Sequence, residues 1–160
     1  MKNLLLLRHA KSSWDFPQLN DYDRPLNNRG KRDAPKMANW LSLQELKVDS
    51  VISSGAERAK STAIAFQALL NAPLDIDDQL YHANRSKLLH QIQQTENNLN
   101  CLLLISHNPG LNDLVDYLLS GFQDNIPTTG LVSLEFATKK WSEASPKNAK
   151  LHFFQYPKNL

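Results

Sequence analysis

Residues 4–9 read Leu-Leu-Leu-Leu-Arg-His, a short apolar run that ends in two basic side chains. Such a run is typical of a strand buried on both faces of a parallel sheet. Residues 101–105, Cys-Leu-Leu-Leu-Ile, repeat the pattern and lead into Ser106 and His107. Because ligands of open α/β sheets bind at the carboxyl ends of the strands, these two stretches predict both the fold class and the place of a site.

The rest of the chain alternates between strand and helix patterns. Further strands are expected over residues 48–53, 74–80, 131–136 and 151–156, and helices over 27–43, 56–70, 85–94 and 109–119. Pro35 either kinks the first helix or marks its first turn. Alternating strands and helices followed by closing strands favour an α/β domain with a mostly parallel sheet. Nothing resembles a linker, so we expect a single domain over residues 1–160.

Composition excludes several classes of protein. The chain is 41% hydrophobic and 21% charged, with a formal net charge of +2, which argues against a dedicated nucleic-acid binder and excludes collagen, a coiled coil or a long disordered chain. The apolar run that stops at Arg8 is too short for a signal peptide, and no segment approaches the roughly 20 apolar residues of a membrane span. We therefore expect a cytoplasmic protein with no membrane partner. The single Cys101 is expected to be a buried strand thiol.

Cationic and imidazole side chains follow three of the predicted strands. Arg8 and His9 end the first strand, Arg58 falls in the first turn of the helix after the second, and His107 follows the strand at 101–106. Helix N-termini at this edge of a sheet bind anions through free N–H groups, and guanidinium groups pair with phosphate oxygens. The four side chains together predict a site for a phosphoryl group.

Each of these residues also has a structural interpretation when it is considered alone. Arg8 could be a solvated charge at a strand end, and His107 could be a structural histidine. Arg58 could pair with Glu57 or Asp49 on the surface. Their common position at one edge of one sheet favours a functional anion site over independent structural roles.

The sequence resembles the histidine phosphatase superfamily, which has the phosphoglycerate-mutase-like fold. The signature is Leu6-Leu7-Arg8-His9-Ala10. Within the superfamily, five blocks resemble the SixA-like phosphohistidine phosphatases and keep their order: Arg8-His9-Ala10-Lys11-Ser12-Ser13-Trp14, Asp23-Arg24-Pro25-Leu26-Asn27 with Arg29-Gly30, Arg58-Ala59 with Thr62-Ala63, Ser106-His107-Asn108-Pro109-Gly110, and Pro127-Thr128. Ala10 and Gly55 depart from the Gly and Pro that are common there, but neither would take part in the chemistry. The resemblance implies a three-layer α/β/α sandwich around the central sheet.

The resemblance also implies roles for the site residues. His9 would be the nucleophile, forming a phosphohistidine intermediate that water hydrolyses. Arg8, Arg58 and His107 would bind the equatorial oxygens of the phosphoryl group. His107 would do this best when protonated, which two arginines oppose and a bound phosphate dianion would restore. Neutral His9 must attack, so activity should fall at acidic pH. Arg24 either adds to the phosphate-binding rim or closes its loop by an ion pair with Asp21 or Asp23.

The acid for the leaving group is not marked by any motif. Asp77 and Asp78 lie in the corresponding part of the chain, and Asp78 is the candidate general acid, although acidic loop residues are mostly solvated. An imidazole leaving group has a reference pKa of about 6.5 and departs with little help from an acid. The pattern therefore favours a phosphoramidate substrate such as protein phosphohistidine.

Three functions fit these residues. The first is a metal-independent phosphatase acting on a phosphohistidine-bearing protein, with phosphotransfer domains of histidine kinases or phosphohistidine carriers of sugar transport as partners implied by the resemblance. The second is a phosphoester or small-molecule phosphatase that uses the same His9 site. The third is a phosphate-dependent binding module without catalysis.

No cofactor and no metal are expected. His82, His90 and His152 have no ligand spacing typical of zinc, and arginines rather than carboxylates mark the site, so Mg²⁺ is not implied. A basic C-terminal region is either a solvated rim or a surface that steers an acidic partner; its lysines are Lys139, Lys140, Lys147, Lys150 and Lys158.

Overall fold

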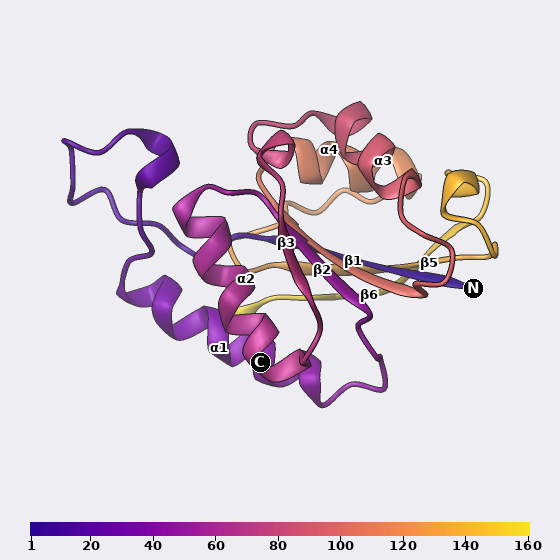
Figure 1. Cartoon of the computed structure of the whole chain (residues 1–160), viewed down its shortest axis with the longest axis horizontal. Helices are drawn as coiled ribbons and strands as arrows, with labels where there is room; N and C mark the ends of the chain where they lie inside the picture. Colours follow the sequence, from indigo (N-terminus) through magenta and orange to yellow (C-terminus); the bar gives the residue numbers. More distant parts are fainter.

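A six-stranded sheet runs through the centre of the computed structural model, which describes residues 1–160 (Figure 1). Its strands are β1 (Lys2–Arg8), β2 (Ser50–Ser53), β3 (Leu74–Ile76), β4 (Cys101–Ser106), β5 (Leu131–Phe136) and β6 (Ala149–Gln155). Their order across the sheet is β3-β2-β4-β1-β5-β6. The first four strands in this order are parallel, and β5 and β6 join as antiparallel strands, which confirms the mostly parallel sheet.

Helices cover both faces of the sheet. Helices α1 (Asn28–Ser42) and α2 (Glu57–Leu70) pack on one face, and α3 (Arg85–Gln93) and α4 (Gly110–Leu118) pack on the other (Figure 1). Successive side chains of β1 alternate between the two cores: Leu4 and Leu6 contact the α3–α4 layer, and Leu5 and Leu7 contact the α1–α2 layer. This confirms the three-layer sandwich and explains why the strand is continuously apolar.

Two local features fix how α1 begins. The Asn27 side chain accepts a hydrogen bond of 2.9 Å from the Gly30 backbone N–H and caps the helix. A Cβ at Gly30 would lie 2.2 Å from the carbonyl oxygen of Lys11, so only glycine lets α1 approach the chain that follows β1. Pro35 lies inside the helix, so of its two alternatives the one in which it marks the first turn does not hold.

The carboxyl ends of β1, β2 and β4 lie at one edge of the sheet, with Arg8 in register with Ser106. The long polar segment after β1 runs past this edge and contains only one short 3-10 turn, Asp21–Asp23. The 74–80 stretch forms a strand only at Leu74–Ile76, after which Asp77 caps the 3-10 turn Asp78–Leu80. Cys101 is buried, as predicted. None of the helices is long and apolar enough to cross a lipid bilayer.

Candidate functional site

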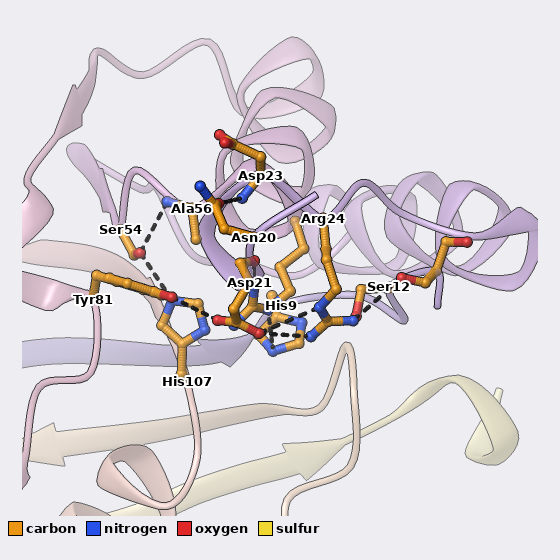
Figure 2. Close-up of polar contacts among 12 residues, drawn as sticks. His9, Ser12, Asn20, Asp21, Asp23, Arg24, Ser54, Ala56, Tyr81 and His107 are labelled. Carbon is orange, nitrogen blue, oxygen red and sulfur yellow. Dashed lines mark hydrogen bonds and ion pairs between the residues drawn. The ribbon is translucent and has the colours of Figure 1, made fainter. Parts of the chain in front are cut away.

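The edge of the sheet brings together the four side chains that the sequence analysis singled out. The His9 and His107 rings lie 5.1 Å apart, and Arg58 Nε donates to His9 Nε2 across 3.4 Å. His9, Arg58 and His107 are only 5–7% exposed. Figure 2 shows His9 and His107 close to the carboxylate of Asp21, in the loop that follows β1. The structure therefore places these groups in one buried, strongly basic spot.

The two ring nitrogens of His9 have different hydrogen-bond roles. Its Nδ1 lies 2.8 Å from the carbonyl oxygen of Ala10, which can only accept a hydrogen bond, so Nδ1 carries the proton and Nε2 carries the lone pair, which accepts the long hydrogen bond from Arg58 Nε. Burial lowers the His9 pKa to about 3, and the charges of Arg58, Arg8 and Arg24 add to this effect against the Ala10 carbonyl. His9 is therefore a neutral imidazole at neutral pH.

The backbone around His9 is held on one side by helix α2 and on the other by the loop before β5. Thr62 Oγ1 accepts from the Ala10 N–H at 2.9 Å and donates to the Arg58 carbonyl at 2.7 Å. On the other side, the Thr129 N–H donates to the His9 carbonyl at 3.1 Å. The His9 ring is thus fixed relative to Arg58 before any substrate binds, which favours a precise reaction geometry.

Three buried polar atoms at this edge have no hydrogen-bond partner within the protein: Arg8 Nε, His107 Nδ1 and Thr129 Oγ1. Arg8 uses Nη1 to hold the Ile126 carbonyl at 3.0 Å, which leaves Nε unused. An unpaired buried polar group costs about 1–3 kcal/mol, so such groups are rare in folded proteins. Three of them at the edge of the sheet that holds His9 indicate a place built for a polar ligand.

The pKa of His107 is lowered, in the direction expected from the neighbouring arginines when no phosphate dianion is bound. Burial lowers its pKa to about 3, with smaller contributions from His9, Arg58 and His82, while Asp21 acts in the opposite direction. Its Nε2 lies 2.8 Å from Ser54 Oγ (Figure 2). Without a bound anion His107 is neutral, because burial adds to the effect of the Arg58 charge.

Asp21 is the site residue that sequence reasoning named only as a possible partner of Arg24. Its carboxylate accepts hydrogen bonds from Arg58 Nη2 at 3.0 Å, Arg24 Nη2 at 3.1 Å and the Tyr81 hydroxyl at 2.6 Å. Partial burial alone would raise the Asp21 pKa, but the hydrogen bonds from Tyr81 and Arg58 and the Arg58 charge hold it well below the usual range. Asp21 is therefore an ionised carboxylate among the site's cations (Figure 2).

Of the two alternatives left open for Arg24, the structure confirms the loop-closing ion pair, and a role at the phosphate-binding rim stays a prediction. It forms the loop-closing ion pair with Asp21, and it is also buried in the same network. Its Nη1 donates to Ser12 Oγ at 2.6 Å, and its guanidinium stacks 3.8 Å above the Trp14 ring. Asp23 does not pair with Arg24; its backbone N–H binds the side chain of Asn20.

Asp78, the candidate general acid, is exposed and accepts a 2.6 Å hydrogen bond from the Tyr22 hydroxyl. A Cβ at Gly55 would collide with this carboxylate, which shows how closely the two pack. No hydrogen bond joins Asp78 to His9 or His107. Asp77 accepts from the Gln79 N–H and acts as a cap.

Comparison with known proteins agrees with this architecture. Residues 4–87 match the family model of the histidine phosphatase superfamily (branch 1). An uncharacterized protein of Mycobacterium tuberculosis is 31% identical over 95% of this chain and 100% of its own length. The phosphohistidine phosphatase SixA of Escherichia coli is 28% identical over 81% of this chain and 82% of its own. A SixA-type structure from Agrobacterium tumefaciens superposes with a TM-score of 0.83 at 27% identity, covering 98% of each chain.

The chain therefore belongs to the histidine phosphatase superfamily and is a phosphatase. The resemblance seen in the five sequence blocks is confirmed at the level of family and fold.

Proposed function

We propose that this phosphatase acts without a metal on phosphohistidine in a partner protein, and that His9 is its nucleophile. The observation that carries the proposal is the state of His9: a neutral, buried ring with its proton on Nδ1 and its Nε2 lone pair inside a cationic site. Arg58 donates to that nitrogen, the His107 ring lies 5.1 Å from the His9 ring, and the buried Arg8 Nε is unpaired, so these three side chains would supply donors for the equatorial oxygens of a phosphoryl group.

The reaction takes place in two steps. In the first, the His9 Nε2 lone pair forms a bond to phosphorus while the bond from phosphorus to the substrate imidazole breaks. The substrate ring, protonated on its other nitrogen, leaves as a neutral imidazole. In the second, a water oxygen bonds to phosphorus and the bond to Nε2 breaks. His9 Nδ1 keeps its proton throughout and donates it in a hydrogen bond to the Ala10 carbonyl, so His9 also leaves as a neutral imidazole. The two protons of the water stay with the phosphate and the solvent.

The carboxylates of the site favour a phosphoramidate over a phosphoester. An alkoxide leaving group needs a proton donor, but Asp21 is held ionised by Arg58 and Tyr81 and cannot supply one. Asp78 is engaged by Tyr22, with no hydrogen bond to the histidines. A neutral imidazole leaving group needs no acid. The SixA relative of Escherichia coli, which is a phosphohistidine phosphatase, supports the same substrate class.

The test is the initial rate of phosphate release, in EDTA, from a phosphohistidine-bearing phosphotransfer domain and from a phosphoserine peptide. We expect the wild type to hydrolyse phosphohistidine much faster than phosphoserine. His9→Ala should lower that rate by at least about 10³-fold, because the covalent route is lost. His90→Ala, on an exposed position of α3, is the matched control and should keep the full rate.

Two results would overturn the proposal. Faster release from phosphoserine would favour the phosphoester function, in which case a carboxylate such as Asp78 must act as the acid. Release that survives His9→Ala would remove His9 from the chemistry.

A further inference from the structure

A basic cavity of about 370 Å³ opens between the first half of α1, the loop before β5 and the C-terminal residues. The residues that define it here are Arg29, Arg32, Lys36 and Lys158, together with Asp33 and Thr128. Four cations thus face one carboxylate. This basic cavity is separate from the His9 site and takes no part in the proposed chemistry.

The topology puts the basic cavity at the same edge of the sheet as His9. Leu7 at the end of β1 pairs with Leu131, and Leu131 pairs with Gln155 at the end of β6, so the chain beyond β6 returns to the carboxyl edge. Figure 1 shows the C-terminus beside α1, and residues 157–159 contact that helix.

The lysines of the C-terminal region therefore do not form one surface, contrary to the sequence expectation. Lys2 pairs with Phe136, so the connection between β5 and β6, which carries Lys139 and Lys147, lies at the opposite edge of the sheet. Only Lys158 reaches the edge that holds His9.

Hydrogen bonds hold the arginines of the basic cavity in place and link them to the edge of the sheet that holds His9. The buried Asp33 carboxylate accepts from Arg29 Nε and Arg32 Nε, each at 3.4 Å. Arg29 Nη2 donates to Thr128 Oγ1 at 3.3 Å. The next residue along the chain, Thr129, holds the His9 carbonyl. A partner bound at the cavity would therefore sit against the loop that supports the nucleophile.

The helix dipole does not explain these charges, although the i,i+4 ion pair of Arg29 with Asp33 stabilises α1. Helix N-termini favour acidic side chains because of the helix dipole, yet α1 has no acidic residue in its first turn and has Arg29, Lys31 and Arg32 near its start. The cations oppose the dipole, so their placement indicates a role toward an external anion.

We infer that the basic cavity docks an acidic surface of the phosphoprotein beside its phosphohistidine, an inference that rests on the proposed function. The Arg32 side chain is 70% exposed and that of Arg29 is 44% exposed. Open, spread cations of this kind match several carboxylates on a macromolecule, whereas a single small anion is normally enclosed by buried donors. Such charge pairing speeds encounter and orients the partner.

The test uses two synthetic phosphohistidine peptides that differ only in flanking residues, one with glutamates and one with glutamines on both sides. We expect the wild type to show a KM about tenfold lower for the glutamate peptide, with kcat unchanged. Lys36→Glu with Lys158→Glu should abolish this preference. Lys139→Glu with Lys147→Glu makes the same charge change at the opposite edge and should preserve it. All four lysines are exposed and none makes a side-chain hydrogen bond.

Binding of the unphosphorylated peptides, followed by fluorescence anisotropy, separates this inference from the proposed function. If wild type binds the glutamate peptide more tightly but hydrolyses neither phosphorylated peptide, the proposed function fails and the docking site stands. Docking is overturned if wild type has no preference, or if both pairs of substitutions weaken the preference equally. It is also overturned if the Lys36 and Lys158 substitutions leave the preference unchanged, because the site arginines would then be its source.

Discussion

Strand β1 has a cation near each end, Lys2 buried and Arg8 half-buried, and the two differ in how their polar atoms are satisfied. At the amino end, Lys2 is 2% exposed, and its Nζ donates to two backbone carbonyls and to Asn100 Oδ1, at 2.6, 3.1 and 2.9 Å. At the carboxyl end, Arg8 binds one carbonyl, that of Ile126, and its buried Nε has no partner.

The carboxylates at the two edges show the same difference. Near Lys2, Asp49 Oδ2 accepts from the backbone N–H groups of Asn100 and Cys101 and so joins two segments of the main chain. At the other edge, Asp21 binds only the side chains of a cationic site. Charged groups bonded to the main chain hold the fold together, whereas those bonded to other side chains of the site, or left partly unpaired, are available to a ligand.

The largest effects are expected when each of the two cations, Arg8 and Lys2, is replaced in turn. Arg8→Gln should lower kcat/KM for phosphohistidine by about 10²- to 10³-fold, the usual effect of losing one oxyanion donor, with little change in the urea midpoint. Lys2→Met should do the reverse: it leaves buried carbonyls without a donor and should lower the free energy of unfolding by about 1–3 kcal/mol, with kcat/KM preserved. Equal losses of activity in the two variants would contradict the distinction.

A second prediction concerns the pH dependence of stability. The pKa values of His9 and His107 are lowered to about 3 in the folded protein, so below the unfolded value of about 6.5 the unfolded chain binds more protons. Stability should therefore fall as the pH drops, by about 2 kcal/mol for each histidine between pH 7 and pH 5. Urea unfolding at both pH values measures this difference.

The matched variants for that experiment are His9→Asn with His107→Asn, and His90→Asn on the exposed surface of α3. The double variant at His9 and His107 should flatten the pH dependence of the free energy of unfolding, and His90→Asn should leave it unchanged. A wild type as stable at pH 5 as at pH 7 would show that the two rings are not held neutral.

The smallest effect is expected at Asp21. Asp21→Asn removes a partly exposed negative charge from between Arg24 and Arg58, so inorganic phosphate should inhibit about three- to tenfold more strongly. Asp23→Asn changes a neighbouring exposed carboxylate that makes no ion pair and should leave the inhibition constant unchanged. Weaker inhibition in the Asp21 variant would show that this carboxylate mainly positions the arginines.

The sequence was sufficient for the parts of the molecule set by periodicity and topology. The apolar run of residues 4–7 predicted a central strand, and parallel strands bring their carboxyl ends to one edge, so Arg8, His9 and His107 could be grouped in advance. Their chemical roles remain predictions.

Other features depended on how irregular segments fold back. Asp21 lies on a loop without periodicity, and its partner Tyr81 is 60 residues away in the chain, so no local pattern could join them. The basic cavity likewise combines Lys36 with Lys158, which meet only because β6 returns the chain to α1. The antiparallel closing strands also separated lysines that the sequence grouped together.

The most direct test of the account is to stop a single turnover with alkali and locate the phosphoryl group by mass spectrometry. We predict that wild type mixed with a phosphohistidine-bearing domain carries a phosphoryl group on His9, and that His9→Ala carries none and releases phosphate at least about 10³-fold more slowly. Substrate consumed at the full rate with no phosphoryl group ever found on His9 would contradict it.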